Sequence, residues 1–218
     1  MHKTIQNLNN INKKIQSKIL NLNYKNYHPK IIAVSKTFDM DNILPLIDYG
    51  HEHYGENKIQ EAIKKWTNIK KDYPKVKLHL LGKVQTNKVK FILPLFDYIH
   101  SLDNIKLAKK ISDEQKKKNF KPKIFIQINL ANESQKSGID ENHISDFYHQ
   151  CINLDLNIIG IMCLPPINED PIPYFSKMNK ISNSSWLTSM GMSSDYLDAV
   201  EYKSSFLRIG SSIFGRRV

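Results

Sequence analysis

Lys36 is the residue whose position best suits covalent chemistry. It follows Lys30-Ile-Ile-Ala-Val-Ser35, a short apolar run rich in branched residues that predicts a buried strand. At the end of such a strand, desolvation lowers the pKa of a lysine amine and makes it a nucleophile toward aldehydes. The alternative is a solvated lysine at a strand end, because the sequence holds 29 lysines and offers many coincidences of this kind.

Two loops rich in glycine and serine follow apolar segments near the end of the sequence. They are Thr188-Ser-Met-Gly-Met-Ser-Ser194 and Arg208-Ile-Gly-Ser-Ser-Ile-Phe-Gly215. Glycine lets a backbone approach a ligand closely, and backbone N–H groups and serine hydroxyls donate hydrogen bonds to phosphate oxygens. The two loops therefore predict a phosphate site, with a pair of ordinary strand-to-helix turns as the alternative.

Three further segments place polar residues within or just after apolar runs. Asn57 stands where a helix begins, so it faces a ligand, caps that helix or does both. His79 lies within a strand, where a histidine is typically a hydrogen-bonded core residue, and Gly82 opens an amide-rich loop that suits a polar ligand or a capped helix start. Lys136, beside the turn residue Gly138, is a second candidate lysine.

The elements that must position these residues alternate along the chain. Strands are predicted at 30–35, 51–54, 77–81, 98–100, 124–129, 156–162, 186–189 and 205–209. Helices are predicted at 3–23, 41–49, 57–71, 86–94, 104–118, 140–152, 171–181 and 194–202. Apolar strands between amphipathic helices indicate a parallel sheet covered by helices. Eight such units in about 190 residues favour a closed barrel over an open sheet. We therefore expect one α/β domain over 1–218, a (β/α)8 TIM barrel with an extra N-terminal helix.

A closed barrel would bring the candidate residues together. The first and eighth strands are neighbours, and functional groups of such barrels gather where the strands end. A lysine after the first strand and a phosphate cradle after the last two would then hold the two ends of one phosphate-bearing aldehyde. Pyridoxal 5′-phosphate (PLP) carries both groups.

Six motifs occur in order along the chain. They are Ala33-Val-Ser-Lys-Thr37, Tyr54-Gly-Glu-Asn-Lys-Ile-Gln-Glu61, His79-Leu-Leu-Gly-Lys-Val-Gln-Thr-Asn-Lys88, Gln127-Ile-Asn129 with Lys136-Ser-Gly-Ile139, Ser189-Met-Gly-Met-Ser193 and Arg208-Ile-Gly-Ser-Ser-Ile-Phe-Gly215. Together they resemble the pyridoxal phosphate homeostasis proteins, single-domain relatives of the alanine racemase N-terminal barrel. The resemblance is collinear and covers nearly the whole chain.

The resemblance implies the roles of two cations. Lys36 would hold PLP as an internal aldimine, and Arg208 would face the pyridine nitrogen, with pairing to a barrel carboxylate as the alternative. A permanent cation beside that nitrogen disfavours its protonation. The ring is then a poorer electron sink, so aminotransferase-type chemistry is disfavoured.

The resemblance also implies the remaining contacts. The residues that would hold the phosphate are Met192, Ser193, Ile209, Gly210 and Ser211. The residues that would line the cofactor are Asn57, His79 and Gly82, and Lys136 matches a second family lysine implicated in PLP handling at the pocket rim.

The family is regarded as binding, buffering and delivering PLP, without an established catalytic reaction. The resemblance therefore implies a PLP homeostasis protein, with PLP-requiring apoenzymes as candidate recipients. The alternative is a racemase-like PLP enzyme, but alanine racemases take a second acid/base, a tyrosine, from a C-terminal β-domain. This chain stops at Val218, right after the last barrel motif. We therefore expect one base to be missing and, without the β-domain interface, a monomer. The segment 164–187 also looks shorter than is usual in the family.

The net charge of +11 first suggests a nucleic-acid partner. However, 29 of the 32 basic residues are lysine, whereas base and phosphate recognition relies on the planar guanidinium of arginine. An abundance of Lys, Ile and Asn is typical of an AT-rich genome, and no recognition motif accompanies the charge. We expect a solvated lysine-rich surface and no nucleic-acid partner, with an electrostatic trap for anions as the alternative.

Cysteine content and hydropathy indicate the compartment. Cys151 and Cys163 are too few for a disulfide framework, which fits a reducing environment. The first residues are polar and carry no signal-peptide pattern, and no apolar run approaches the ~20 residues of a membrane span. We expect a cytoplasmic protein with no membrane partner.

Overall fold

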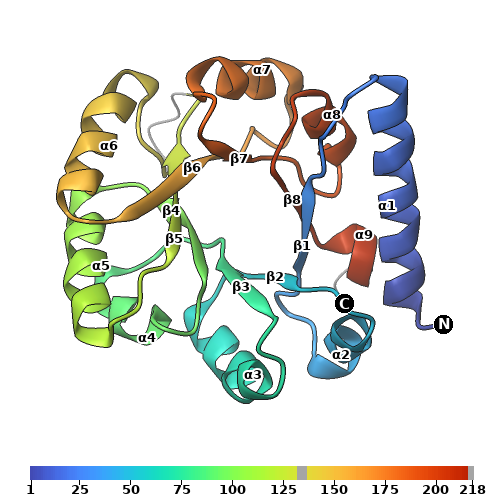
Figure 1. The fold of residues 1–218 in the computed structure, drawn as a ribbon, viewed down its shortest axis with the longest axis horizontal. Coiled ribbons are helices and arrows are strands. Elements are labelled where there is room, and N and C mark those ends of the chain that lie inside the picture. Colours follow the sequence, from blue (N-terminus) through green and yellow to red (C-terminus); the bar gives the residue numbers. More distant parts are fainter. Residues whose placement is uncertain (132–136, 216–218) are drawn as a thin grey trace.

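Eight parallel strands close into a barrel in a computed structural model that describes residues 1–131 and 137–215. The strands follow each other around the barrel in chain order, so that β8 pairs with β1 (Figure 1). Their bounds are β1 Lys30–Val34, β2 His53–Glu56, β3 Lys77–Leu80, β4 Tyr98–Leu102, β5 Lys123–Ile128, β6 Asn157–Cys163, β7 Leu187–Ser189 and β8 Phe206–Ile209. The predicted (β/α)8 barrel is confirmed.

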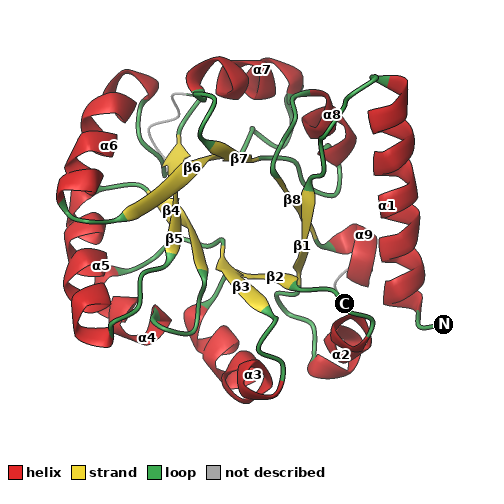
Figure 2. Cartoon of the chain, viewed as in Figure 1, coloured by secondary structure: helices red, strands yellow, loops and turns green. Residues whose placement is uncertain are grey.

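Helices surround this barrel on its outside (Figure 2). The α-helices are α1 Lys3–Asn21, α2 Met40–Asp48, α3 Ile59–Asp72, α4 Val89–Ile92, α5 Ile105–Lys118, α6 Ile144–Asn153, α7 Ile172–Ile181, α8 Tyr196–Glu201 and α9 Ser211–Phe214, and two 3-10 turns are η1 Thr86–Lys88 and η2 Glu141–His143. The helix expected at 86–94 is instead a 3-10 turn followed by the four-residue α4. Pro94 explains its early end, because a proline disfavours helical backbone in the residue before it.

The extra helix α1 covers the side of the barrel where the chain ends. It packs against α2, α8 and α9, and Figure 1 shows it in blue beside the red C-terminal elements. Its buried apolar residues recur every three or four positions and are Leu8, Ile11, Ile15 and Ile19. Asn7 Nδ2 donates a hydrogen bond of 2.8 Å to the carbonyl of Ile213, so α1 also fastens α9, which belongs to one of the two glycine- and serine-rich loops.

Residues alternate between the inside and the outside of the barrel along each strand. One buried cluster consists of Ile32, Val34, Tyr98, Phe125, Met162 and Phe206. Outward-facing residues join the helices in a second, larger buried cluster. The barrel also buries the polar residues His79, His100, Ser189 and Arg208. The interior is therefore a packed core that contains hydrogen-bonding groups.

The register of β1 and β8 determines where the candidate site lies. Ile32 is paired with Arg208, and both strands run in the same direction. Lys36 follows β1 by two residues and Gly210 follows β8 by one, so both leave the barrel at the same rim. The first and last strands of the barrel thus bring their following residues together at the predicted site.

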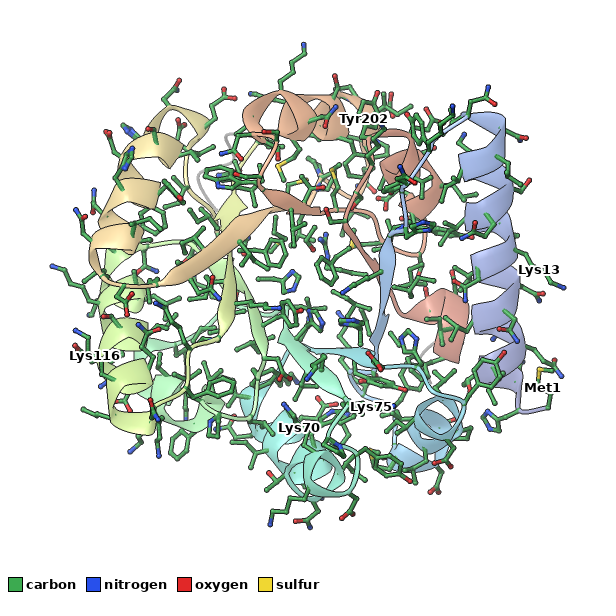
Figure 3. The ribbon with its side chains drawn as sticks, viewed as in Figure 1. Met1, Lys13, Lys70, Lys75, Lys116 and Tyr202 are labelled. Atoms are coloured by element: carbon green, nitrogen blue, oxygen red, sulfur yellow. The ribbon has the colours of Figure 1, made fainter. Side chains whose placement is uncertain are left out.

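Many lysines lie on the outer faces of the helices. Lys13 on α1 and Lys116 on α5 are exposed and point away from the barrel (Figure 3). Among the described residues, no helix combines the length and the apolar character that a bilayer crossing needs.

Candidate functional site

A cavity of about 630 Å³ opens at the carboxyl ends of the strands. Its lining residues are Val34, Lys36, Asn57, Leu81, Met162, Leu164, Met192, Ser193, Ser194, Arg208, Gly210 and Ser211. Residues that follow the first, second, seventh and eighth strands thus meet around one space. The sequence predicted this convergence for Lys36 and the two glycine- and serine-rich loops.

The loop that carries Lys36 has a constrained backbone. Lys36 is half-buried in a turn directly after β1, and the next residue, Thr37, has a φ of 69°. A β-branched residue seldom adopts this left-handed conformation, which costs about 1–3 kcal/mol. The N–H of Thr37 donates a hydrogen bond of 2.6 Å to Glu61 Oε1 on α3. The loop is therefore held in one conformation by a side chain from the neighbouring helix.

Lys65 on α3 provides a second anchor for this loop. Its Nζ donates hydrogen bonds to the carbonyls of Ser35, at 2.8 Å, and Phe38, at 3.1 Å. The same ammonium forms ion pairs with the fully buried Glu56, at 2.7 Å, and with Glu61, at 3.0 Å. Desolvation raises the pKa of Glu61, but the hydrogen bonds from Thr37 and Lys65 outweigh it, and the net shift is downward. No sequence motif predicts this network, because its members lie on three different elements.

Ser193 joins the two glycine- and serine-rich loops. Its Oγ accepts hydrogen bonds from the N–H groups of Gly210, at 3.2 Å, and Ser212, at 3.3 Å. A Cβ at position 210 would lie 3.2 Å from the carbonyl oxygen of Val34, so glycine there allows close approach to β1. Two backbone donors therefore converge at the cavity wall, as they would on a phosphate oxygen, and Ser193 Oγ engages both of them here. Phosphate contacts from Ser193, Gly210 and Ser211 stay predictions.

Two residues predicted to contact the phosphate, Met192 and Ile209, have backbone groups that other parts of the protein already engage or bury. Met192 lines the cavity, but its N–H donates to Oδ1 of Asp195 and is already engaged. Ile209 is fully buried, is paired with Ala33 in the sheet, and does not belong to the lining. Phosphate contacts from these two backbones stay predictions.

Arg208 brings a buried positive charge to the cavity. It is 5% exposed, and its Nη1 and Nη2 donate hydrogen bonds of 2.8 Å to Ser189 Oγ and to the carbonyl of Cys163. Both acceptors are neutral, and no ion pair joins Arg208 to a carboxylate among the described residues. Burial lowers the pKa of the guanidinium, which nevertheless stays protonated at neutral pH. A buried cation that no carboxylate directly pairs favours an electron-rich ligand atom in front of it.

Asn57 lines the cavity, but the helix-cap alternative is wrong. Helix α3 begins at Ile59, its N-cap position is Lys58, and no side chain caps it. The position of Asn57 depends on Gly82, because a Cβ there would lie only 2.2 Å from the carbonyl oxygen of Asn57. Gly82 itself lines a neighbouring cavity of about 790 Å³, which shares four lining residues with the first.

His79 lies behind the cavity and not on its wall. It is fully buried and stacks on Tyr98 with 4.1 Å between ring centroids. Its two nitrogens form hydrogen bonds of 2.9 Å with His53 and His100. The expectation of a hydrogen-bonded core histidine is confirmed, and direct contact with a cofactor is not supported by the lining. Lys136 lies outside the described residues.

Residues 7–218 match the family described as "Alanine racemase, N-terminal domain". The chain is 35% identical to the pyridoxal phosphate homeostasis protein of Buchnera aphidicola subsp. Schizaphis graminum over 97% of both chains. It is 32% identical to the protein of the same name from Aquifex aeolicus, over 86% of this chain and 87% of that one. The chain belongs to the pyridoxal phosphate homeostasis protein family. The human member is 31% identical over 87% of this chain and 77% of its own.

Solved structures agree with this membership. PipY of Synechococcus elongatus, solved with PLP bound, has a TM-score of 0.79 and 29% identity, over 92% of this chain and all of that one. An alanine racemase of Clostridium difficile has a TM-score of 0.70 at 14% identity, over 99% of this chain and 57% of the racemase. The racemase comparison shows the shared barrel fold alone.

Proposed function

We propose that this protein binds PLP as an aldimine on Lys36 and serves PLP homeostasis by storing the cofactor and delivering it to PLP-requiring apoenzymes. One observation carries the proposal: Lys36, the Ser193–Gly210 cradle and the buried Arg208 charge line the same cavity. The names of the relatives and the PLP-bound PipY structure support it.

Each chemical group of PLP has a matching partner in the cavity. The amine of Lys36 would condense with the aldehyde, and Ser193, Gly210 and Ser211 would receive the phosphate. Arg208 uses two of its five N–H donors on the protein, which leaves donors for the pyridine nitrogen. A nitrogen that accepts from a guanidinium keeps its lone pair and carries no proton. The cavity therefore suits holding PLP better than using it as an electron sink.

The lining favours storage over racemisation. Among the described lining residues, Lys36 and Arg208 are the only ionisable side chains, and no Tyr, His, Asp or Glu lines the same cavity. Racemisation needs a second acid/base on the other face of the substrate. The PLP-loaded protein is therefore expected to exchange Cα hydrogens of amino acids no faster than free PLP in deuterated water. Exchange well above that rate would favour the racemase alternative.

Titration of the apoprotein with PLP tests the binding proposal. The wild type is expected to develop an imine absorption band that saturates at one PLP per chain. Lys36→Ala is expected to leave the spectrum of free PLP. Lys83→Ala is the matched control, because this exposed lysine lines only the neighbouring cavity. An undiminished imine band in Lys36→Ala would refute the assignment, and Lys136 would be the first alternative lysine to test.

We also propose a monomeric cytoplasmic protein that forms one barrel domain over 1–218. The two cysteines, Cys151 and Cys163, are free and buried, which is consistent with a reducing compartment. Light scattering on the eluting protein is expected to give the mass of one chain. A mass of two chains would contradict the monomer.

A further inference from the structure

A chain of hydrogen bonds crosses the barrel and ends on Arg208. His53 Nδ1 and His79 Nε2 lie 2.9 Å apart, and so do His79 Nδ1 and His100 Nε2. His100 Nδ1 lies 3.0 Å from Ser189 Oγ, which accepts the hydrogen bond of 2.8 Å from Arg208 Nη1. The links come from five different strands, β2, β3, β4, β7 and β8. This set of residues, called the histidine chain below, connects the amino ends of the strands with the cavity.

The guanidinium, together with the need of the buried Ser189 hydroxyl for an acceptor, determines the direction of every link. Arg208 can only donate, so Ser189 Oγ accepts from it. Ser189 is fully buried, and a buried hydroxyl proton without an acceptor is costly. Among the described residues, the other hydrogen-bond partner of this hydroxyl is His100, so the hydroxyl donates its proton to His100 Nδ1. His100 must then carry its proton on Nε2 and donate to His79 Nδ1. By the same argument His79 donates from Nε2 to His53 Nδ1, which leaves the His53 proton on Nε2 as well.

The surroundings keep the three histidines of the histidine chain neutral. His79 and His100 are fully buried, and desolvation is the main cause that holds their pKa values well below the ordinary range. The next cause is electrostatic: His100 acts on His79, and Arg208 acts on His100. His53 is half-buried, and burial together with Lys30, His51, Lys77 and Lys123 lowers its pKa to about 4. A second proton on His79 or His100 would also place two donors face to face. The chain therefore has one stable arrangement of its protons.

We propose that His79, His100 and Ser189 are positioning residues for Arg208, and that their one-directional hydrogen-bond chain fixes the guanidinium against the ring of the bound cofactor. The proposal rests on the proposed function only for the identity of the cofactor, because the direction of the chain follows from the protein alone. Ser189 and the carbonyl of Cys163 hold one donor on each terminal nitrogen of the planar guanidinium, so the directions of its three remaining N–H groups are fixed as well. Without Ser189 Oγ, the guanidinium keeps its charge but loses this orientation.

Nitrogen NMR of histidine-labelled protein tests the direction of the chain. At neutral pH, His53, His79 and His100 are all expected as neutral imidazoles protonated on Nε2, with or without PLP. An Nδ1-protonated tautomer or an imidazolium at His100 would overturn the proposal. Because this readout needs no cofactor, it stays decisive even if the protein does not bind PLP.

Serine variants test the positioning role. Ser189→Ala is expected to release PLP about tenfold faster to a trapping apoenzyme, the loss associated with one charge-assisted hydrogen bond. It is also expected to shift the absorption maximum of the bound cofactor. Ser189→Thr keeps the hydroxyl and is expected to restore both properties toward wild type.

Ser204→Ala is the matched control for these variants. Ser204 is also fully buried. Its Oγ accepts a hydrogen bond from the Met190 N–H, and its single proton lies within reach of the carbonyls of Met190 and Phe206, without a link to Arg208. This control is expected to lower the melting temperature and leave the PLP spectrum and release rate unchanged. Equal effects of Ser189→Ala and Ser204→Ala on release, or no effect of Ser189→Ala, would overturn the proposal. Absence of PLP binding by wild type would instead refute the proposed function.

Discussion

At the scale of single residues, Lys36 and Arg208 differ from the other cations in their surroundings. The exposed lysines lie on outer helix faces, as Lys13 and Lys116 do, where water solvates them. Lys36 is half-buried in the rigid turn after β1, and Arg208 is buried against two neutral acceptors. The net charge of +11 therefore gives little information on function, whereas the burial of these two cations gives a great deal.

Arg208→Met is expected to weaken PLP binding at least about tenfold, because a charge-assisted hydrogen bond contributes about 1.5–3 kcal/mol. The substitution keeps much of the side-chain volume and removes the donor that would face the pyridine nitrogen. The dissociation constant is measured by absorbance titration. Arg208→Lys, which keeps the charge but loses the two-point attachment, is expected to fall between wild type and Arg208→Met. Equal affinity of all three proteins would show that Arg208 does not contact the cofactor.

At the scale of elements, the loop after β1 depends on α3. Lys65 contacts two carbonyls of this loop and two carboxylates, so one ammonium ties β1, β2 and α3 together. Glu56 also accepts hydrogen bonds from Ser35 Oγ, at 2.8 Å, and from Trp66 Nε1, at 3.0 Å. A buried network of this kind holds the turn that carries Lys36 before any ligand arrives.

Lys65→Met is expected to destabilise the protein by about 3–5 kcal/mol, because it leaves the buried carboxylate of Glu56 without its cation. Urea unfolding of the wild type, Lys65→Met, Glu56→Gln and the double variant measures the coupling between the two residues. The double variant is expected to lose less stability than the sum of the single variants. Simple additivity would contradict a direct interaction.

The sequence predicts elements better than it predicts contacts between them. The barrel follows from the alternation of apolar runs and amphipathic helices, and Lys36 and the two loops follow from their places after strands. Asn57 was assigned a second role as a helix cap, which the start of α3 at Ile59 excludes. The histidine chain was missed because His100 and Ser189 lie 89 residues apart. One histidine in each of three successive strands was the signal that could have suggested it.

At the scale of the whole molecule, the buried histidines link folding to pH. Burial first of all lowers the pKa values of His51 and His53 to about 4 and holds those of His79 and His100 well below the ordinary 6.5. Well above pH 6.5 these groups are neutral in both the folded and the unfolded chain and add no pH dependence. Below it the unfolded chain binds protons that the folded protein excludes, so stability falls as the pH falls.

The free energy of unfolding is therefore expected to decrease between pH 6.5 and 4.5, by up to about 1.4 kcal/mol per pH unit for each of these histidines. Urea denaturation at several pH values measures this slope. His100→Phe keeps an aromatic ring against Phe125 and is expected to reduce the slope by the share of one histidine. A flat profile over this range would contradict the neutral buried chain.

Borohydride reduction of the PLP-loaded protein, followed by mass mapping of its peptides, tests the central claim most directly. Reduction converts an imine into a stable secondary amine, which marks the lysine that held the cofactor. We expect one reduced pyridoxyl phosphate group per chain, on the peptide that contains Lys36, and no such group in Lys36→Ala. A label on another lysine, or no label on a protein that has bound PLP, would show that Lys36 does not hold the cofactor.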